Sequence, residues 1–156
     1  MTQALWVLCL LLLAAGYIAA PSGPVLAAGL GNRAMTCDAV GPASIDNLLV
    51  TRHMIRAMPR QFADFRPVAA VCPGVLARTG LEALELVRGA VERVRPAAVI
   101  AVGIPTVVDA DPRAGLFLTP RDIDQRIREL GRLLGYGITL ALQPSLTAAD
   151  VTALLG

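Results

Sequence analysis

The sequence predicts an α/β fold: a three-layer sandwich around a small, mostly parallel sheet. Short apolar runs that suit buried strands alternate with amphipathic stretches that suit helices, and this alternation favours parallel pairing through right-handed crossovers. The 156 residues suffice for one hydrophobic core but not for two. Mean hydropathy is high, at +0.61, which indicates either strands covered on both faces or a membrane segment beside a globular domain.

The first twenty residues form an apolar leader whose role the sequence leaves open. Residues 4–20 are almost wholly apolar, and no Lys or Arg precedes them as in a typical signal peptide. One interpretation is a buried helix that ends near Gly16; the other is a membrane or export segment. We expect a single α/β domain over residues 24–156.

Three strands are predicted in chain order. Pro24–Asn32 contains a short buried strand that runs into a glycine loop, and Pro67–Val71 is the second candidate. Ala97–Val102 is the third, and because it is entirely apolar we expect it to be buried on both faces. Between the first two strands, residues 44–58 show helical periodicity.

The later helices are predicted from their capping residues. Thr79 with Glu82 forms a capping-box pattern, and the helix it opens is closed by Pro96. Thr119, with a proline directly after it, predicts the start of another helix, and a shorter helix follows Thr147. The apolar stripe expected for the helix after Thr119 comprises Ile123, Ile127, Leu130, Leu133 and Leu134.

Charge and cysteine content exclude several classes of function. The net charge is only +2 and the basic residues are scattered, whereas a nucleic-acid surface needs a dense basic patch. Cys9, Cys37 and Cys72 show no CxxC spacing, and His53 is the sole histidine, so we expect neither a metal site nor a disulfide framework. Buried, reduced thiols are the expectation, and no cofactor is predicted.

A glycine loop followed by an aspartate carries the chemistry that the residues suggest. Gly29, Gly31 and Asn32 lie where ligands usually bind, at the carboxyl end of a strand, and they are our candidates for substrate binding. The loop lacks the third glycine of a dinucleotide fingerprint and the Lys of a phosphate loop. Asp38 follows, either as an acid/base group acting on water or as a cap that begins a helix.

A series of motifs resembles the spore germination protease family, in the same order, from about Val25 to Gln143. The motifs are GLGN (29–32), CDAVGP (37–42), DNLLVTRH (46–53), FRPV (65–68), PGV (73–75), TGLE (79–82), GIPTVVDA (103–110) and LTPRDID (118–124). Each motif is short, but an ordered series of this length is specific.

The resemblance implies an endopeptidase of spore-forming bacteria that degrades small acid-soluble spore proteins during germination. It also implies a zymogen, a tetrameric assembly, a location in the cytoplasm of the spore core, and a fold like that of the hydrogenase-maturation proteases. The family's proposed mechanism uses two aspartates, one of which matches Asp38. Two carboxylates in different protonation states can activate water and protonate the leaving amide.

The chain departs from the family pattern after Val102, where the second catalytic aspartate is expected. Gly103 begins a motif that belongs after a later strand, so an internal segment with that aspartate is missing. Cys37 stands where proline is usual, and Gln143 where histidine is usual.

Four other residues are candidates to replace the missing catalytic group. Asp109 is a weak substitute candidate, with Asp111 close to it, because catalytic geometry tolerates little displacement. His53 suits a surface position, and Cys72 has no histidine placed to activate it. The alternative function is therefore a non-catalytic truncated paralogue that acts as a binding or assembly partner; residues 4–20 would make either version membrane-associated.

Overall fold

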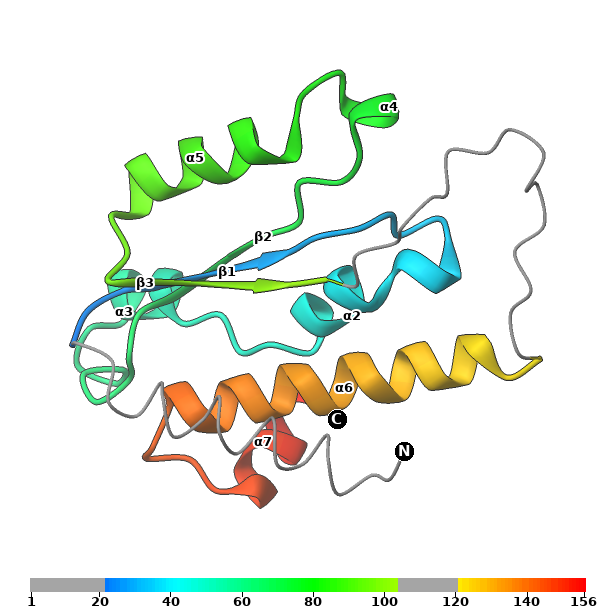
Figure 1. The fold of residues 1–156 in the computed structure, drawn as a ribbon. Coiled ribbons are helices and arrows are strands. Elements are labelled where there is room, and N and C mark those ends of the chain that lie inside the picture. Colours follow the sequence, from blue (N-terminus) through cyan, green and yellow to red (C-terminus); the bar gives the residue numbers. More distant parts are fainter. Residues whose placement is uncertain (1–21, 104–120) are drawn as a thin grey trace, which may run out of the picture.

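The computed structural model describes residues 22–103 and 121–156. Within these ranges strands and helices alternate along the chain, as Figure 1 shows. The elements are β1 (Val25–Gly29), the short 3-10 helix η1 (Thr36–Asp38), α2 (Val40–Asp46), α3 (Arg52–Ala57), β2 (Val68–Val71), α4 (Leu76–Thr79), α5 (Ala83–Val94), β3 (Ala98–Val102), α6 (Ile123–Leu142) and α7 (Ala148–Leu155).

The three strands form one parallel sheet in the order β2-β1-β3. Val25 of the central strand pairs with Val68 on one side and with Ala98 on the other. Helix α5 lies on one side of the sheet, and α2 and α6 lie on the other (Figure 1). The predicted α/β class and the small parallel sheet are confirmed.

The core lies between the sheet and the α2–α6 side. Because side chains alternate along a strand, every second residue points to this side. The core consists of Val25, Ala27, Leu48, Val68, Ile100 and Leu142, with Ile45, Ala70, Val102 and Ile138 packed against it.

Two glycines let α6 approach α2 closely. A Cβ on Gly131 would lie 2.6 Å from the Cβ of Ala43, and one on Gly135 would lie 2.5 Å from the carbonyl oxygen of Asn47. The predicted leucine stripe of α6 is only partly correct: Ile127 is buried, but Leu133 is exposed. The buried line of α6 instead comprises Ile127, Gly131, Gly135, Thr139 and Leu142.

The helix expected over residues 44–58 is wrong as one element, because it is two helices separated at residues 47–51. The backbone N–H of Leu49 donates to Thr139 Oγ1, at 3.0 Å, and Thr51 Oγ1 accepts from the N–H of Val68, at 2.9 Å. These bonds to α6 and β2 take the place of helical bonds.

The predicted capping box at Thr79 is also wrong. Thr79 ends α4, and its hydroxyl donates to the carbonyls of Val75 and Leu81. Glu82 is instead the N-cap of α5, in a capping box with Glu85. The capping box therefore begins at Glu82 and not at Thr79, because a short helix ends at Gly80 before α5 begins.

The burial of β3 and the starts of the last two helices can be compared with the predictions. The strand expected to be buried on both faces is exposed in part, since only Ile100 of β3 is buried and Val99 is 43% exposed. The helix predicted after Thr119 begins at Ile123, while Thr119 itself lies outside the described residues. The helix after Thr147 is confirmed, and the Thr147 hydroxyl accepts from Asp150 N–H as a cap.

The leader over residues 4–20 lies outside the described residues, so both interpretations of it stay predictions. In the part of the chain that the structure does describe, no helix is long and apolar enough to cross a membrane.

Candidate functional site

The parallel sheet brings the carboxyl ends of its strands to one edge. Gly29 ends β1 beside Val102, which ends β3, and Cys72 directly follows β2. The N–H of Leu30 donates to the carbonyl of Val102, at 2.7 Å, so the glycine loop continues the pairing beyond β1. The predicted glycine loop therefore lies at the sheet edge where α/β proteins usually bind ligands.

Gly31 allows the backbone of Asp38 to approach this loop. Its φ of +127° disfavours any residue with a Cβ, and a Cβ there would lie 2.1 Å from the carbonyl oxygen of Asp38. The same Cβ would lie 3.0 Å from Asp38 Oδ1. Glycine at this position is thus required by both conformation and space.

A hydrogen bond fixes the half-buried Asp38 carboxylate against the loop. The backbone N–H of Asn32 donates to Asp38 Oδ2, at 2.8 Å. Asn32 also accepts from Ala34 N–H through its side chain, at 3.0 Å, and from Met35 N–H through its carbonyl, at 3.0 Å. These bonds close residues 32–38 into a compact turn, which brings Gly31, Asn32 and Asp38 together.

Close packing holds the start of α2 against the same edge. A Cβ on Gly41 would lie 2.2 Å from the carbonyl oxygen of Leu30 and 2.4 Å from that of Val102. A Cβ on Gly29 would lie 2.6 Å from the carbonyl oxygen of Gly41. Because α2 begins two residues after Asp38, these contacts also limit the movement of the aspartate.

An ion pair lies further along the loop. The guanidinium of Arg33 donates to both carboxylate oxygens of Asp46, with the Nη2–Oδ1 bond at 2.9 Å. The hydrogen bond to Asp46 raises the pKa of Arg33. Both side chains are largely exposed, so we expect this pair to contribute little to stability.

Cys72 remains a weak candidate for a nucleophile. Partial burial of the sulfur raises the pKa of the thiol, although the residue as a whole is exposed and the Arg33 guanidinium nearby acts in the opposite direction. A raised pKa lowers the fraction of thiolate at neutral pH. The expectation that the thiols are reduced agrees with free Cys37 and Cys72, but Cys72 is exposed rather than buried, because it follows the end of β2.

The remaining candidates are separate from Asp38 or outside the described residues. His53 is exposed on α3, as expected for a surface residue. Asp109 and Asp111 lie outside the described residues, so whether either meets Asp38 stays a prediction. Within residues 22–103 and 121–156, no three His, Cys, Asp or Glu side chains gather as metal ligands.

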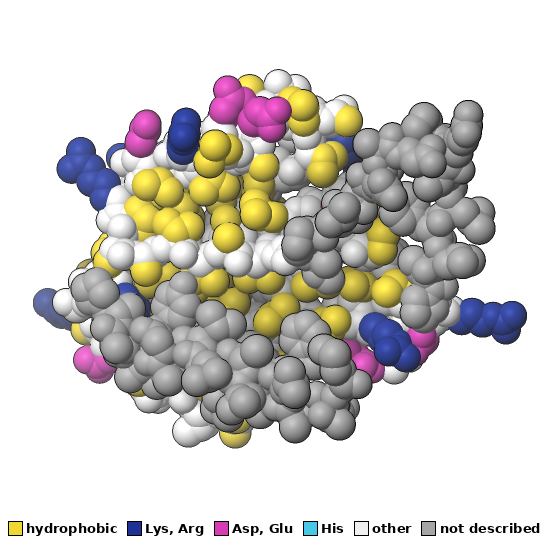
Figure 2. All heavy atoms as spheres, in the orientation of Figure 1, with side chains coloured by type: hydrophobic (Ala, Val, Ile, Leu, Met, Phe, Trp, Pro, Cys, Tyr) yellow, Lys and Arg dark blue, Asp and Glu magenta, His cyan; other side chains and the backbone are white. Residues whose placement is uncertain are grey.

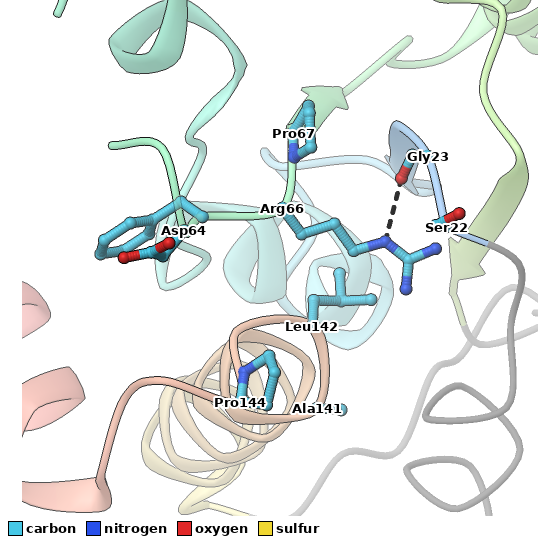
Figure 3. A pocket seen from close by; sticks show the side chains of 9 residues that line it. Ser22, Gly23, Asp64, Arg66, Pro67, Ala141, Leu142 and Pro144 are labelled. Atoms are coloured by element: carbon cyan, nitrogen blue, oxygen red, sulfur yellow. Dashed lines mark hydrogen bonds between the residues drawn. The ribbon is translucent and has the colours of Figure 1, made fainter. Parts of the chain in front are cut away.

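A cavity of about 370 Å³ lies at the opposite edge of the sheet, near the residues that precede β1 and β2. Figure 3 shows the Arg66 side chain extending into it between Gly23 and Leu142. Arg66 Nε donates to the carbonyl of Gly23, at 3.0 Å. Since Gly23 and Pro67 precede the strands that end near Asp38, this cavity is distinct from the Asp38 edge.

Gln143 fixes the backbone of Arg66 beside this cavity. Its fully buried amide accepts from Arg66 N–H, at 2.9 Å, and donates to the Arg66 carbonyl, at 2.8 Å. The same carbonyl accepts from the Thr51 hydroxyl. Sequence reasoning noted Gln143 only as a departure from the family pattern; the structure shows it joining the end of α6 to the start of β2.

The sequence profile of the germination proteases matches residues 18–104, which is more than half of the chain. The chain belongs to the germination protease family. This match contains the glycine loop, Asp38 and the three strands that the described residues form, so the predicted family is confirmed.

Individual germination proteases match either over a short stretch at higher identity or over most of the chain at lower identity. That of Priestia megaterium is 46% identical over 78 residues, which cover 49% of this chain and 21% of the relative. That of Bacillus subtilis is 44% identical over a stretch of the same length. That of Caldanaerobacter subterraneus is 28% identical over 225 positions, which cover 84% of this chain and 69% of the relative.

The chain matches only part of the length of these relatives. The chain spans about a fifth of the length of the Priestia megaterium protein that it matches. The alignment with the Caldanaerobacter subterraneus protein has 225 positions, more than the 156 residues of this chain. Part of that relative, inside the aligned region, therefore has no counterpart here.

Proposed function

We propose that this chain acts in peptide-bond hydrolysis as an aspartate-dependent endopeptidase of the germination protease type. Its substrates are the small acid-soluble spore proteins that the family resemblance implies, degraded during germination. The observation that carries the proposal is the position of Asp38, which Asn32 holds by a 2.8 Å hydrogen bond at the carboxyl edge of the sheet.

In this proposal, Asp38 is one of two acid/base carboxylates. A carboxylate has several lone pairs, so one that accepts from a backbone N–H can also act as a general base toward water. Gly31 and Asn32, which are half-buried, bind the substrate backbone beside it. Gly29 is buried against Gly41, so its part in substrate binding is to position this loop. No cofactor or metal takes part.

The family's second catalytic aspartate, expected directly after Val102, has no counterpart there in this chain. We propose that an internal segment with that aspartate is absent after Val102. Two facts support this: the family profile stops matching at residue 104, and the longer alignment has more positions than the chain has residues. Asp109 is the substitute within the chain, with Asp38 as its partner.

The family also suggests a location, an assembly and a fold relationship. We propose that the protein acts in the cytoplasm of the spore core as a homo-oligomer of the family's tetrameric kind. Its three-stranded parallel sheet is the central part of a hydrogenase-maturation protease-like fold. Association with a membrane through residues 4–20 is the alternative.

Cleavage of a purified small acid-soluble spore protein tests the activity. We expect the full chain to produce defined fragments, detected by mass spectrometry, and Asp38→Asn to abolish them. Asp124→Asn is the matched control, because Asp124 is exposed in the first turn of α6. Fragments that persist with Asp38→Asn would exclude the proposed role of Asp38.

A second candidate function is a non-catalytic paralogue that binds a complete germination protease. The alignment length favours it, since the relatives contain residues that this chain lacks. It predicts that the full chain cleaves nothing but forms a complex with a complete protease from this family, measurable by size-exclusion chromatography. Cleavage by the full chain, lost in Asp38→Asn, would exclude this candidate.

A further inference from the structure

A second cavity lies between α2 and the amino-terminal half of α6, two helices that pack against each other (Figure 1). Its volume is about 490 Å³, which is in the range of ligand sites. Figure 2 shows basic and acidic side chains on the surface near the start of α6. We call this cavity the α2–α6 groove, and its polar lining residues are Asp46, Asn47, Gln125, Arg128, Glu129 and Arg132.

Two arginines give the α2–α6 groove an excess of positive charge. Arg128 and Arg132 are exposed and lie one helical turn apart, where like charges repel each other. Within residues 22–103 and 121–156 neither arginine forms an ion pair. The charge of Asp46 is offset by its pair with Arg33, which leaves Glu129 as the other acid of the lining. An added anion would therefore be attracted to this groove.

The polar groups of the groove suit a peptide that carries carboxylates. The guanidinium carbon of Arg132 lies 5.8 Å from the centroid of the Tyr136 ring, a cation–π contact that does not use its N–H donors. Asn47 Nδ2 donates to a backbone carbonyl of α2, at 2.8 Å, and Gln125 Nε2 donates to Glu129 Oε1, at 2.7 Å. Each of these amides keeps its own oxygen as an acceptor. The groove thus combines donors for carboxylates with acceptors for peptide N–H groups.

The groove is connected to the turn that holds Asp38. Asp46 of the groove is bonded to Arg33, which belongs to the turn of residues 32–38. The 3-10 helix η1, which contains Asp38, packs against α6 as well. Helix α2 joins the two places and, with seven residues, is roughly 10 Å long. About three or four residues of an extended peptide cover that length. A substrate held at Asp38 can therefore reach the groove with side chains a few residues away.

We propose that the α2–α6 groove binds an acidic segment of the peptide substrate. Arg128 and Arg132 pair with carboxylates of this segment, and the oxygens of Asn47 and Gln125 accept from its backbone N–H groups. The identity of the occupant rests on the proposed peptidase function, since the groove extends the site at Asp38. The binding of an acidic peptide does not require that function.

A nucleic acid suits the groove less well than a peptide does. The carboxylates of Asp46 and Glu129 lie in the same lining as the two arginines, and they would oppose a continuous row of phosphates. A peptide can place neutral side chains against these two acids and its own carboxylates against the arginines. The charge pattern of the groove therefore favours an acidic peptide.

Fluorescence anisotropy of a labelled hexaglutamate peptide, titrated with the full chain, tests the binding. We expect saturable binding that weakens with added salt, and a dissociation constant that rises about fivefold when Arg128→Gln and Arg132→Gln are combined. Arg88→Gln combined with Arg93→Gln is the matched control, because these exposed arginines of α5 lie on the other side of the sheet and their loss changes the net charge equally. Absence of binding, or an equal loss in both double variants, would overturn the proposal.

Two further probes test the chemistry of the occupant. Labelled hexaglutamine has the same length without the carboxylates, so we expect it to bind more weakly than hexaglutamate. Labelled hexathymidylate offers phosphates in place of carboxylates, and we expect it to bind more weakly as well. If either probe binds as tightly as hexaglutamate, the groove does not select an acidic peptide and the proposal is wrong.

The groove and the peptidase function can fail separately. Asp38→Asn should leave hexaglutamate binding unchanged, because Asp38 does not line the groove. A chain that binds hexaglutamate through the two arginines but cleaves nothing would contradict the peptidase function alone. If the chain does cleave a small acid-soluble spore protein, the Arg128→Gln and Arg132→Gln double variant should raise KM and leave kcat unchanged, since it removes binding and not chemistry. Cleavage with an unchanged KM in that variant would contradict the role of the groove and leave the role of Asp38 intact.

Discussion

The two sides of the sheet are packed very differently. On the α2–α6 side, Ile100 and Leu142 are buried in a continuous core, and the glycines of α6 bring it against α2. On the other side, α5 contains no buried residue, and a Cβ on its Gly89 would meet nothing within 4 Å. On the α5 side only the central strand is well covered, since Leu26 and Ala28 of β1 are buried there while Val99 of β3 is exposed.

This difference indicates which part of the molecule provides stability and which part is available for contacts. The α2–α6 side also holds the start of α2 against the strand ends, next to Asp38, so the core supports the candidate site. The α5 side has exposed apolar surface that its own helix does not cover. Substitutions on the two sides should therefore have unequal effects on stability.

The largest difference is expected for leucine truncation. Leu142→Ala should lower the free energy of unfolding by about 2–5 kcal/mol, because Leu142 is 1% exposed and its removal leaves a cavity. Leu84→Ala on α5 should change it by no more than about 0.5 kcal/mol. Urea denaturation followed by circular dichroism measures both, and similar losses would contradict the contrast between the two sides.

A smaller effect, of opposite sign on the two sides, is expected for glycine substitution. Gly135→Ala gains about 1 kcal/mol in helix propensity, but the new Cβ would lie 2.5 Å from a backbone oxygen, at an overpacking cost of about 1–3 kcal/mol. We expect a net loss. Gly89→Ala meets no neighbour and should raise the free energy of unfolding by about 0.5–1 kcal/mol. A stabilising Gly135→Ala would show that α2 and α6 can separate easily.

Much of the fold could be predicted because its signals are local. The three strands, the cap at Thr147 and the glycine loop before Asp38 each depend on residues adjacent in sequence. The break at residues 47–51 could not be predicted, since it depends on a bond from Leu49 to Thr139, ninety residues later. The exposure of Val99 depends on how α5 lies over the sheet, since α5 packs over β1 and β2, and the composition of β3 does not reveal that.

The candidate site could be predicted in identity but not in geometry. The order of the motifs was enough to select Asp38, Gly31 and Asn32. It could not show that Asn32 donates to Asp38, or that Gly31 is required because the Asp38 carbonyl would otherwise be 2.1 Å from a Cβ. The role of Gln143 was missed for the same reason, because its bonds to Arg66 join segments far apart in sequence.

The smallest effect is expected at α7, which packs against α6 on the denser side. The Thr147 hydroxyl donates to Asp150 Oδ2, at 2.6 Å, and this bond, with one from Thr147 N–H, lowers the pKa of Asp150. A lowered carboxyl pKa in the folded state stabilises α7 at pH values above the usual carboxyl range. That contribution is lost as the pH falls through the lowered pKa.

We therefore expect the amide protons of α7 to exchange faster relative to those of α6 as the pH is lowered below about 4, after correction for intrinsic rates. Hydrogen exchange followed by NMR measures this local opening. Asp150→Asn should remove the pH dependence, because an amide side chain does not titrate in this range. If α7 opens with the same pH dependence in Asp150→Asn, the effect belongs to another carboxylate. The Thr147–Asp150 cap would then not be the interaction that keeps α7 folded against α6.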